Sequence, residues 1–257
     1  MILAVIALDV GNTHIHGGVF IDNEIKLRFR YVSTELSSDQ LGVFLKSVLR
    51  ENGVDDSHIV AIAIASVVPS VDYSIRSACL KYFSIDPFFI KLGVKTGVQI
   101  QTKHPQQVGA DLVAGCVGAM NRLPGQSLVV ADFGTATTLC AITHDKKLKG
   151  AVILPGLRTM MRALQMSAEQ LPSVEITDPG QCLGNDTVSA IQVGIFQSQR
   201  CMLQELPKLI AQAHFSSGSY HLVGTGGFSH LFSDMFHLQN PDLVLEGVYA
   251  IYQMNIA

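Results

Sequence analysis

Residues 4–20 read AVIALDVGNTHIHGGVF, and residues 127–142 read SLVVADFGTATTLCAI. Each stretch has an apolar run, then an Asp-x-Gly turn with a Thr close behind it, then a second apolar run. A short apolar run that ends at turn residues predicts a buried strand, so each stretch predicts two strands joined by a turn. Because the same pattern occurs twice, about half a chain apart, the sequence predicts a duplicated α/β domain.

The residues that follow the first stretch extend the pattern. Ile25–Val32 alternates like a third strand, and Ser38–Gly53 has its apolar residues at helical spacing before a terminal Gly. Ile59–Val68 predicts another buried strand, and Asp111–Met120 predicts the beginning of a helix. Strands that alternate with helices in this way are typical of an α/β fold with helices packed on mixed sheets.

The domain boundary is predicted near residue 118. No low-complexity linker marks the joint, so the boundary is placed at the helix that separates the two repeated stretches. This division gives an N-terminal domain of residues 1–118 and a C-terminal domain of residues 119–257.

Composition and charge exclude several classes of protein. Hydrophobic residues make up 48% of the 257 residues, charged residues make up 15%, and the net charge is −3. A nucleic-acid-binding protein usually concentrates Lys and Arg, so no nucleic acid partner is expected. No apolar run reaches the length of a membrane span, and the opening run lacks the features of a secretory signal, so we expect a cytoplasmic protein without a membrane partner. The apolar composition favours a homo-oligomer.

The first turn, Asp9-Val10-Gly11-Asn12-Thr13, has residues suited to an anion. Gly11 allows backbone N–H groups to approach a phosphate, and Asn12 and Thr13 add neutral donors. An Asp at such a site can act through a bound cation. The alternative is an ordinary hairpin turn, in which Asp, Asn and Gly are the commonest residues. His14 and His16, on one face of the next strand, could form half of a metal site, but no third ligand is evident.

Two later motifs repeat this chemistry. Asp132, Gly134, Thr135, Thr137 and Thr138 form a turn rich in hydroxyls, which could hold a phosphate or a cation or could be another hairpin. Gly224-Thr225-Gly226-Gly227 follows a predicted strand at Tyr220–Val223, and bare backbone there could accept a flat ligand such as a base and ribose. No P-loop motif occurs in the sequence.

Taken together, the motifs resemble a known family. Two Asp-Gly-Thr turns in duplicated domains and a late Gly-rich strand end are similar to the ATP site of the superfamily of actin, heat-shock chaperones and sugar kinases. Within it the series resembles the type III pantothenate kinases, in order from residue 2 to about residue 250. The motifs that carry the resemblance are Asp9–Thr13, Ser66–Pro69, Gly109–Asp111, Asp132–Thr138, Pro155–Leu157, Leu171-Pro172, Gly184–Thr187 and Thr225–Gly227.

The resemblance implies a fold and an activity. The fold would be two duplicated ribonuclease H-like (actin-like ATPase) domains, with mixed sheets flanked by helices and a cleft between them. The activity would be phosphorylation of pantothenate by ATP to 4′-phosphopantothenate, the first step of coenzyme A biosynthesis. ATP with Mg²⁺ and a monovalent cation, K⁺ or NH₄⁺, would be required, and the assembly would be a homodimer.

The resemblance also implies a role for particular residues. Asp111 would be the catalytic base, and Asp132 would hold the monovalent cation. ATP would contact Asp9, Val10, Gly11, Asn12, Thr13, His14, Ile15, His16 and Thr135. Pantothenate would contact Gly109, Ala110, Asp111, Leu112 and Thr187.

The position of Asp111 agrees with the implied role. A carboxylate in the first turn of a helix is favoured as the anion by the helix dipole, and an ionised, positioned carboxylate can accept a hydroxyl proton. The alternative is that Asp111 is only a helix N-cap. The sequence departs from the family at Leu112, where an Arg is usual, and at Thr102, where a Tyr is usual.

Two other functions remain open at this point. The departures at Leu112 and Thr102 are compatible with a kinase for another small hydroxylated substrate. Because the family also includes proteins named as transcriptional accessory factors, a non-catalytic regulatory relative is the second alternative. The presence of Asp9, Asp111 and Asp132 argues against the latter, and the acidic net charge argues against direct DNA binding.

Overall fold

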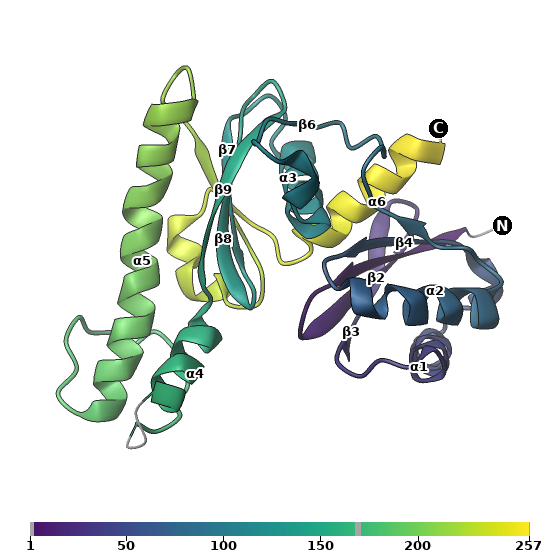
Figure 1. Cartoon of the computed structure of the whole chain (residues 1–257), viewed down its shortest axis with the longest axis horizontal. Helices are drawn as coiled ribbons and strands as arrows, with labels where there is room; N and C mark the ends of the chain where they lie inside the picture. The colour runs from purple at the N-terminus through teal and green to yellow at the C-terminus, as the bar shows by residue number, and fades with distance from the viewer. Residues whose placement is uncertain (1–2, 168–170, 257) are drawn as a thin grey trace. The chain divides into compact units, whose positions relative to one another are not determined.

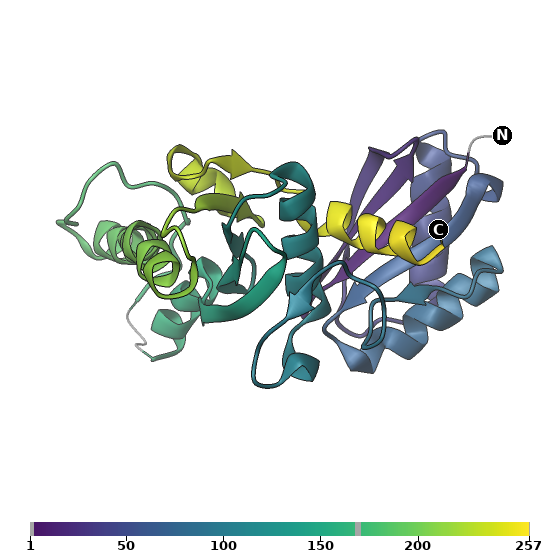
Figure 2. The same ribbon diagram turned by 90° about the horizontal axis from the view of Figure 1, so that it is seen from above.

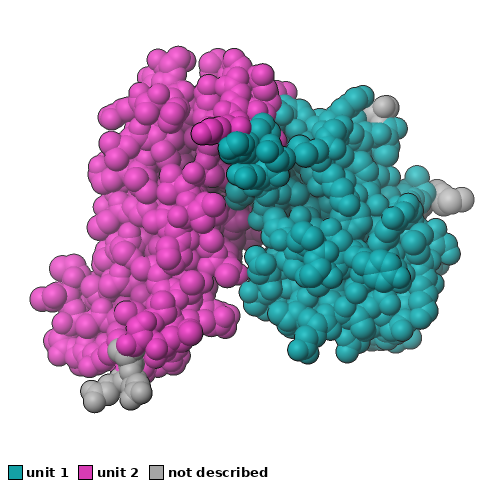
Figure 3. All heavy atoms as spheres, viewed as in Figure 1, with its two compact units in different colours: residues 1–98, 104–121, 243–257 teal, residues 99–103, 122–242 magenta. Residues whose placement is uncertain are grey.

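A computed structural model of the chain describes residues 3–167 and 171–256. The chain forms two compact units (Figure 3). Unit 1 is built from residues 1–98, 104–121 and 243–257, and unit 2 from residues 99–103 and 122–242. The boundary predicted near residue 118 falls inside helix α3 (Ala110–Arg122), and the division into two domains at that point stays a prediction.

The sheet of unit 1 has the strand order β3-β2-β1-β4-β5. The pairs β3–β2 and β2–β1 are antiparallel, whereas β1–β4 and β4–β5 are parallel. Apart from Asp9 near its end, β1 is apolar because it is central in the sheet and covered on both faces, whereas exposed residues alternate along β3, which is an edge strand. The strands are β1 (Ala4–Val10), β2 (His14–Ile21), β3 (Glu24–Val32), β4 (Ile59–Ser66) and β5 (Phe88–Phe89).

Helices cover both faces of this sheet (Figures 1 and 2). α1 (Ser38–Glu51) and α2 (Pro69–Phe83) pack their apolar stripes on one face, into a core that includes Ile6, Leu8 and Ile64. α6 (Leu243–Ile256) lies against the other face, where Tyr249 stacks on Phe20 with ring centroids 4.2 Å apart. Short 3₁₀ helices lie at Asp56–His58 and Pro105–Gln107.

Helices α3 and α6 approach each other closely within unit 1. A Cβ atom added at Gly118 would lie 2.1 Å from the carbonyl oxygen of Leu243, and one added at Gly247 would lie 1.8 Å from that of Ala114. Both positions therefore require glycine, because any side chain would force the two backbones apart. This contact holds α3, which carries Asp111, against the helix that covers the sheet.

The sheet of unit 2 repeats the first sheet and adds one strand. Its order is β11-β10-β7-β8-β9-β6, and the five strands from β11 to β9 match β5 to β3 in order and in direction. The predicted duplicated α/β fold with mixed sheets is therefore confirmed. The strands are β6 (Gln99–Ile100), β7 (Leu128–Phe133), β8 (Ala136–Ile142), β9 (Lys147–Pro155), β10 (His221–Thr225) and β11 (Leu238–Gln239).

One face of the second sheet is covered by α4 (Leu157–Ser167), α5 (Thr187–His214) and a 3₁₀ segment at Ser229–Met235. The core there includes a column of phenylalanines, in which Phe232 stacks on Phe133 at 5.1 Å and on Phe196 at 5.0 Å. Within the described residues, no helix has both the length and the apolar character needed to span a bilayer.

Candidate active site

The β1–β2 turn of unit 1 carries the first group of predicted ATP contacts. Asp9 pairs in register with His16, and Val10 pairs with Ile15. The backbone N–H of Gly11 donates to the carbonyl oxygen of His14 at 3.0 Å and closes the turn. The segment is therefore a hairpin, and the residues at its tip, from Gly11 to His14, are exposed or half-buried. This geometry agrees with an ordinary hairpin turn. It also agrees with an anion site, because the tip of the turn is accessible.

The space around Gly11 favours the anion site. Its φ angle lies outside the left-handed region, and a Cβ atom there would meet only the His14 carbonyl oxygen, at an ordinary 3.4 Å. The chain itself therefore does not require glycine at this position. A bare backbone at an accessible turn leaves room for an anion to approach the N–H groups closely.

Asp111 lies in the first turn of α3, which the sequence predicted as a helix start. The helix begins at Ala110, so Asp111 is inside it rather than at its N-cap. The N–H of Leu112 donates to Asp111 Oδ1 at 2.7 Å. Leu112, which replaces the family's usual Arg, thus contributes its backbone to the carboxylate, while its side chain is half-buried.

Val67 connects the first turn to Asp111 within unit 1. Its N–H donates to the carbonyl oxygen of Val10 at 3.1 Å. A Cβ atom at Gly109 would lie 3.3 Å from Val67 Cγ1 and 2.3 Å from Asp111 Oδ1, so a side chain there would displace the Asp111 carboxylate. The Asp9 turn and the beginning of α3 are therefore neighbours.

The electrostatic prediction for Asp111 is corrected by the structure. The helix dipole was expected to favour the anion, which would lower the pKa. Instead, burial raises the pKa of Asp111, and the N–H groups of Leu112 and of Asp111 itself oppose this only in part. A carboxylate with a raised pKa holds a proton more readily, which suits a general base.

In unit 2, Asp132 is flanked by threonines on both neighbouring strands. It pairs in register with Thr138 of β8 and with Thr225 of β10, so the three side chains project from the same face of the sheet. Asp132 and Thr138 are half-buried, and Thr225 is only 1% exposed. A carboxylate between hydroxyls offers oxygen ligands only.

The donor set around Asp132 fits a hard monovalent cation. Within the described ranges, 3–167 and 171–256, the buried Oγ1 atom of Thr138 has no hydrogen-bond partner. Thr137 Oγ1 also lacks one, but Thr137 pairs with Phe133 and projects from the opposite face of the sheet. Buried hydroxyls without a partner are unusual, and a bound ion is one explanation for them. Among the residues that the structure describes, no cluster of three or more His, Cys, Asp or Glu is suited to a metal. A metal site at His14 and His16 therefore has no third ligand of these types in the described part of the chain.

The space around the Gly-rich segment at the end of β10 differs from what the sequence predicted. The glycines of this segment were expected to leave room for a flat ligand. A Cβ atom at Gly224 would lie 2.5 Å from the ring of Phe236, and one at Gly226 would lie 2.4 Å from Asp132 Oδ1 and 2.5 Å from the Phe133 nitrogen. Protein atoms therefore fill the space that side chains would take, and Gly226 also has φ +86°. Gly226 thus lets the end of β10 pack against the Asp132 turn, and Gly224 makes room for the Phe236 ring.

The beginning of α4 supports the Thr135 turn. The N–H of Gly156 donates to the carbonyl oxygen of Thr135 at 3.1 Å, and Thr159 Oγ1 donates to the same oxygen at 2.6 Å. A Cβ atom at Gly156 would lie 2.4 Å from the Gly134 carbonyl oxygen. The Pro155-Gly156 motif thus acts on the turn through its backbone, which leaves the side chain of Thr135 exposed.

Thr187, a predicted pantothenate contact, is the first residue of α5 and is exposed. Asp186 caps the helix by accepting from the Ser189 N–H at 2.9 Å, which lowers the pKa of Asp186. A Cβ atom at Gly184 would lie 2.2 Å from the Ala190 nitrogen, so this glycine allows the chain to turn into the helix.

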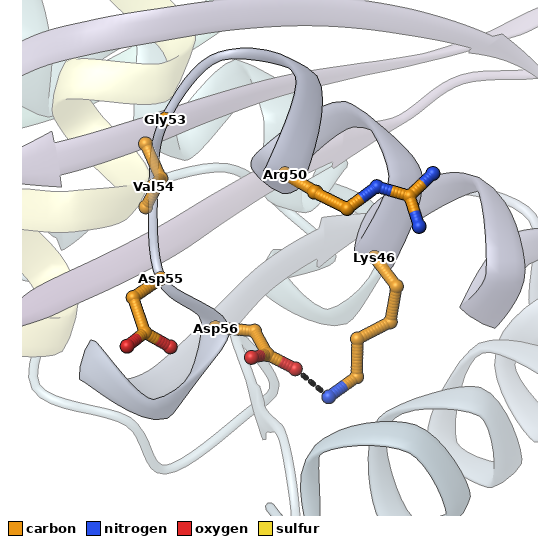
Figure 4. Close-up of a pocket in the computed structure, with 6 residues that line it drawn as sticks. All are labelled: Lys46, Arg50, Gly53, Val54, Asp55 and Asp56. Atoms are coloured by element: carbon orange, nitrogen blue, oxygen red, sulfur yellow. Dashed lines mark ion pairs between the residues drawn. The ribbon is translucent and has the colours of Figure 1, made fainter.

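Two surface cavities lie among other residues. One of about 500 Å³ is lined by residues from the end of α1 and the turn after it, including Lys46, Arg50 and Asp55 (Figure 4). Lys46 is ion-paired with Asp56, and Asp55 accepts from the Ser57 N–H at 2.9 Å, so these charges already have structural partners. The second, about 460 Å³, lies on α2 around Tyr73 and Arg76. Neither contains a residue of the predicted site.

Comparison with known proteins identifies relatives over the whole chain. A family model described as type III pantothenate kinase matches residues 5–208. Proteins named type III pantothenate kinase from Legionella pneumophila (strain Corby) and type III pantothenate kinase 1 from Francisella tularensis subsp. holarctica (strain OSU18) are 48% and 41% identical. The alignments cover 98% of this chain and 100% and 99% of the two relatives, respectively.

Solved structures share the fold at lower identity. A Campylobacter jejuni protein assigned to the Baf family of transcriptional activators aligns with a TM-score of 0.62 at 18% identity, over 98% of both chains. The activator of 2-hydroxyisocaproyl-CoA dehydratase from Clostridium difficile, solved with bound ADPNP, aligns with a TM-score of 0.54 at 12% identity, over 98% of this chain and 95% of that one. At these identities the likeness concerns the fold alone.

Proposed function

The chain belongs to the family of type III pantothenate kinases, and from this premise we propose that it transfers the γ-phosphoryl group of ATP to the hydroxyl group of pantothenate. The products would be ADP and 4′-phosphopantothenate, which is the entry to coenzyme A biosynthesis. The observation that carries the proposal is the position of Asp111, half-buried beside the Asp9 turn with a raised pKa.

Asp111 is proposed as the general base. The hydroxyl oxygen of pantothenate forms a bond to the γ-phosphorus, the bond from that phosphorus to the β–γ bridging oxygen breaks, and the hydroxyl proton goes to the Asp111 carboxylate. Because α3 is held by the glycine contacts with α6, the carboxylate is positioned before the substrate arrives. Gly109, Ala110, Leu112 and Thr187 are the proposed remaining contacts to pantothenate.

The proposed ATP contacts are the segment Asp9–His16 and Thr135. Support comes from the accessible turn, from the open space around Gly11 and from the exposed Thr135 side chain. Asp9 offers a carboxylate oxygen to Mg²⁺, a cation that neutralises charge on the phosphates in phosphoryl transfer.

Asp132 is proposed to hold a monovalent cation, K⁺ or NH₄⁺. Support comes from the flanking threonines and from the buried Thr138 hydroxyl that lacks a partner in the described part of the chain. The proposed protein is a cytoplasmic homodimer. Its apolar composition and exposed side chains such as Met166 and Leu183 favour a partner subunit.

A coupled assay of ADP release tests the proposed function. The purified protein should release ADP only when ATP and pantothenate are both present, faster with K⁺ than with Na⁺ as the only monovalent cation. ADP release with another hydroxylated acceptor, with pantothenate inert, would favour a different small-molecule kinase, which Leu112 and Thr102 make worth testing. No acceptor-dependent ADP release at all would favour a regulatory relative.

A further inference from the structure

A row of three polar side chains crosses the sheet of unit 1 at the Asp9 turn. β3 pairs with β2 so that Arg30 lies opposite His16, and β2 pairs with β1 so that His16 lies opposite Asp9. Residues directly opposite on neighbouring strands project from the same face of a sheet. Arg30, His16 and Asp9 therefore share one face and one level of the sheet.

Helix α6 packs on this same face of the sheet but lies over the part that is farther from the turn. Further along β2, Gly18 faces Leu245, and Phe20 stacks on Tyr249, so α6 lies over that end of the strands. Arg30 lies toward the turn and is exposed. Within residues 3–167 and 171–256, Arg30 has no hydrogen-bond or ion-pair partner. Its guanidinium group is thus available to a ligand at the turn.

The reach of an arginine side chain suits this position. Neighbouring strands lie about 4.8 Å apart, so the backbone of Arg30 is roughly 10 Å from that of Asp9. An extended arginine spans most of such a distance, and it can lean over His16 toward the open side of the turn. The guanidinium fork can then bind two oxygens of one phosphate.

The three segments that carry most of the predicted site lack a Lys or Arg of their own. The segments 9–16, 109–112 and 132–138 contain no Lys or Arg, whereas they contain three aspartates. A triphosphate brings further negative charge, which a site must offset with cations or backbone donors. Arg30 is the basic residue that the strand register brings to the level of Asp9.

The duplicated sheet shows that the fold does not require arginine there. In unit 2 the equivalent row runs from Asp132 through Thr138 to Ile153 on β9. Ile153 occupies the position of Arg30 and is 70% exposed. The charge at residue 30 is therefore a feature of unit 1 and not of the architecture.

We propose that Arg30 is a phosphate-binding residue, which contacts the phosphate oxygens of the nucleotide held at the Asp9–His16 turn. The inference rests on the proposed function for the location of ATP. It adds a positive charge from the third strand to a site whose motifs supply none.

Steady-state kinetics of Arg30→Gln tests the proposal, with Lys26→Gln as the matched control. Lys26 lies on the same strand, is exposed and forms an ion pair with Glu24. We expect the KM for ATP of Arg30→Gln to rise about tenfold, as for the loss of a charged hydrogen bond, with the KM for pantothenate unchanged. The KM for ATP of Arg30→Lys should lie between those of the wild type and Arg30→Gln, and the KM for ATP of Lys26→Gln should match that of the wild type.

Several results would overturn the proposal. One is a KM for ATP in Arg30→Gln equal to that in Lys26→Gln, and another is an increase in the KM for pantothenate alone, which would assign Arg30 to the acceptor. Equal thermal midpoints for the variants exclude a folding defect, and Arg30→Lys provides the test if Arg30→Gln is unstable. If the wild type fails to use pantothenate, the proposed function fails, but calorimetric binding of ATP to the same variants still decides the role of Arg30.

Discussion

The two duplicated sheets present different chemistry at the same position. In unit 1 the row across the strands is Arg30, His16, Asp9 and Ala65. In unit 2 the equivalent row is Ile153, Thr138, Asp132 and Thr225. Only the aspartate is common to both rows. The backbone pattern was thus retained on duplication while the neighbours of the aspartate diverged.

The difference agrees with the division of labour that we propose between the units. The first row combines a carboxylate with basic side chains beside an accessible turn, which suits phosphates and a divalent cation. The second row surrounds its carboxylate with neutral hydroxyls and with the backbone at Gly226, which suits a partly dehydrated monovalent cation. Substitutions in the two rows can test this difference, and substitution of Asp111 can test the base that unit 1 alone contributes.

The largest effect is expected from Asp111→Asn. The variant should lose about 10²- to 10⁴-fold in kcat, because the amide cannot accept the hydroxyl proton. ATP binding should be retained, since Asp111 is proposed to act on the acceptor. Burial raises the pKa of Asp111, so its ionised form opposes folding, and the variant should be at least as stable as the wild type at neutral pH. Kinetics and thermal unfolding measure both effects, and wild-type turnover would remove Asp111 from the mechanism.

The next largest effect concerns the two glycines beside the aspartates. Gly226→Ala should destabilise the protein by about 1–3 kcal/mol, because it combines a positive φ with close contacts to Asp132 and Phe133. Gly11→Ala, the matched change in unit 1, should alter stability by less than about 1 kcal/mol and instead weaken ATP binding. Denaturant unfolding and ATP titration separate these outcomes. Equal destabilisation by both variants would contradict the account of the Asp9 turn.

The pH dependence of kcat/KM provides a third test. Because burial raises the pKa of Asp111, activity should be lost as the pH falls through a value above the ordinary range of an aspartate, about tenfold per pH unit below it. The stability effect has the opposite sign, since protonation of this buried carboxyl favours the folded state. A pH–rate profile measured at constant ionic strength checks the acidic limb. An acidic limb at or below the pKa of an exposed aspartate would contradict the assignment.

A smaller effect is expected from Thr138→Val, which removes the hydroxyl beside Asp132 and nearly preserves the shape of the side chain. The K⁺ concentration for half-maximal activity should rise several-fold, by about the effect of one lost oxygen contact. Thr138→Ser, which keeps the hydroxyl, is the control and should resemble the wild type. Activity of Thr138→Val that responds to K⁺ as the wild type does would exclude Thr138 from the cation site.

The sequence predicted the features that depend on local pattern. Apolar runs and turn residues located the strands around Asp9 and Asp132, and the repeated pattern predicted the duplication that the strand orders confirm. The helix start at Asp111 was predicted by the same kind of evidence. Such features are local because strand and helix periodicities act over a few residues.

Features that depend on tertiary neighbours were not predictable. The raised pKa of Asp111 comes from burial, which the helix-dipole argument could not include. The role of Gly226 depends on a carboxylate almost a hundred residues earlier in the chain, and the position of Arg30 depends on the register of two strand pairs. A pattern search that compared the third strands of the two repeats could have indicated the contrast between Arg30 and Ile153.

The division between an anion site in unit 1 and a cation site in unit 2 is the central claim, and a crystal structure tests it most directly. Crystals grown with a non-hydrolysable ATP analogue, Mg²⁺ and Tl⁺ in place of K⁺ would locate both ions, since Tl⁺ has a strong anomalous signal. The account predicts phosphate oxygens at the Asp9–His16 turn and a Tl⁺ peak beside Asp132 and Thr138. A Tl⁺ peak at Asp9, or phosphates bound away from that turn, would contradict it.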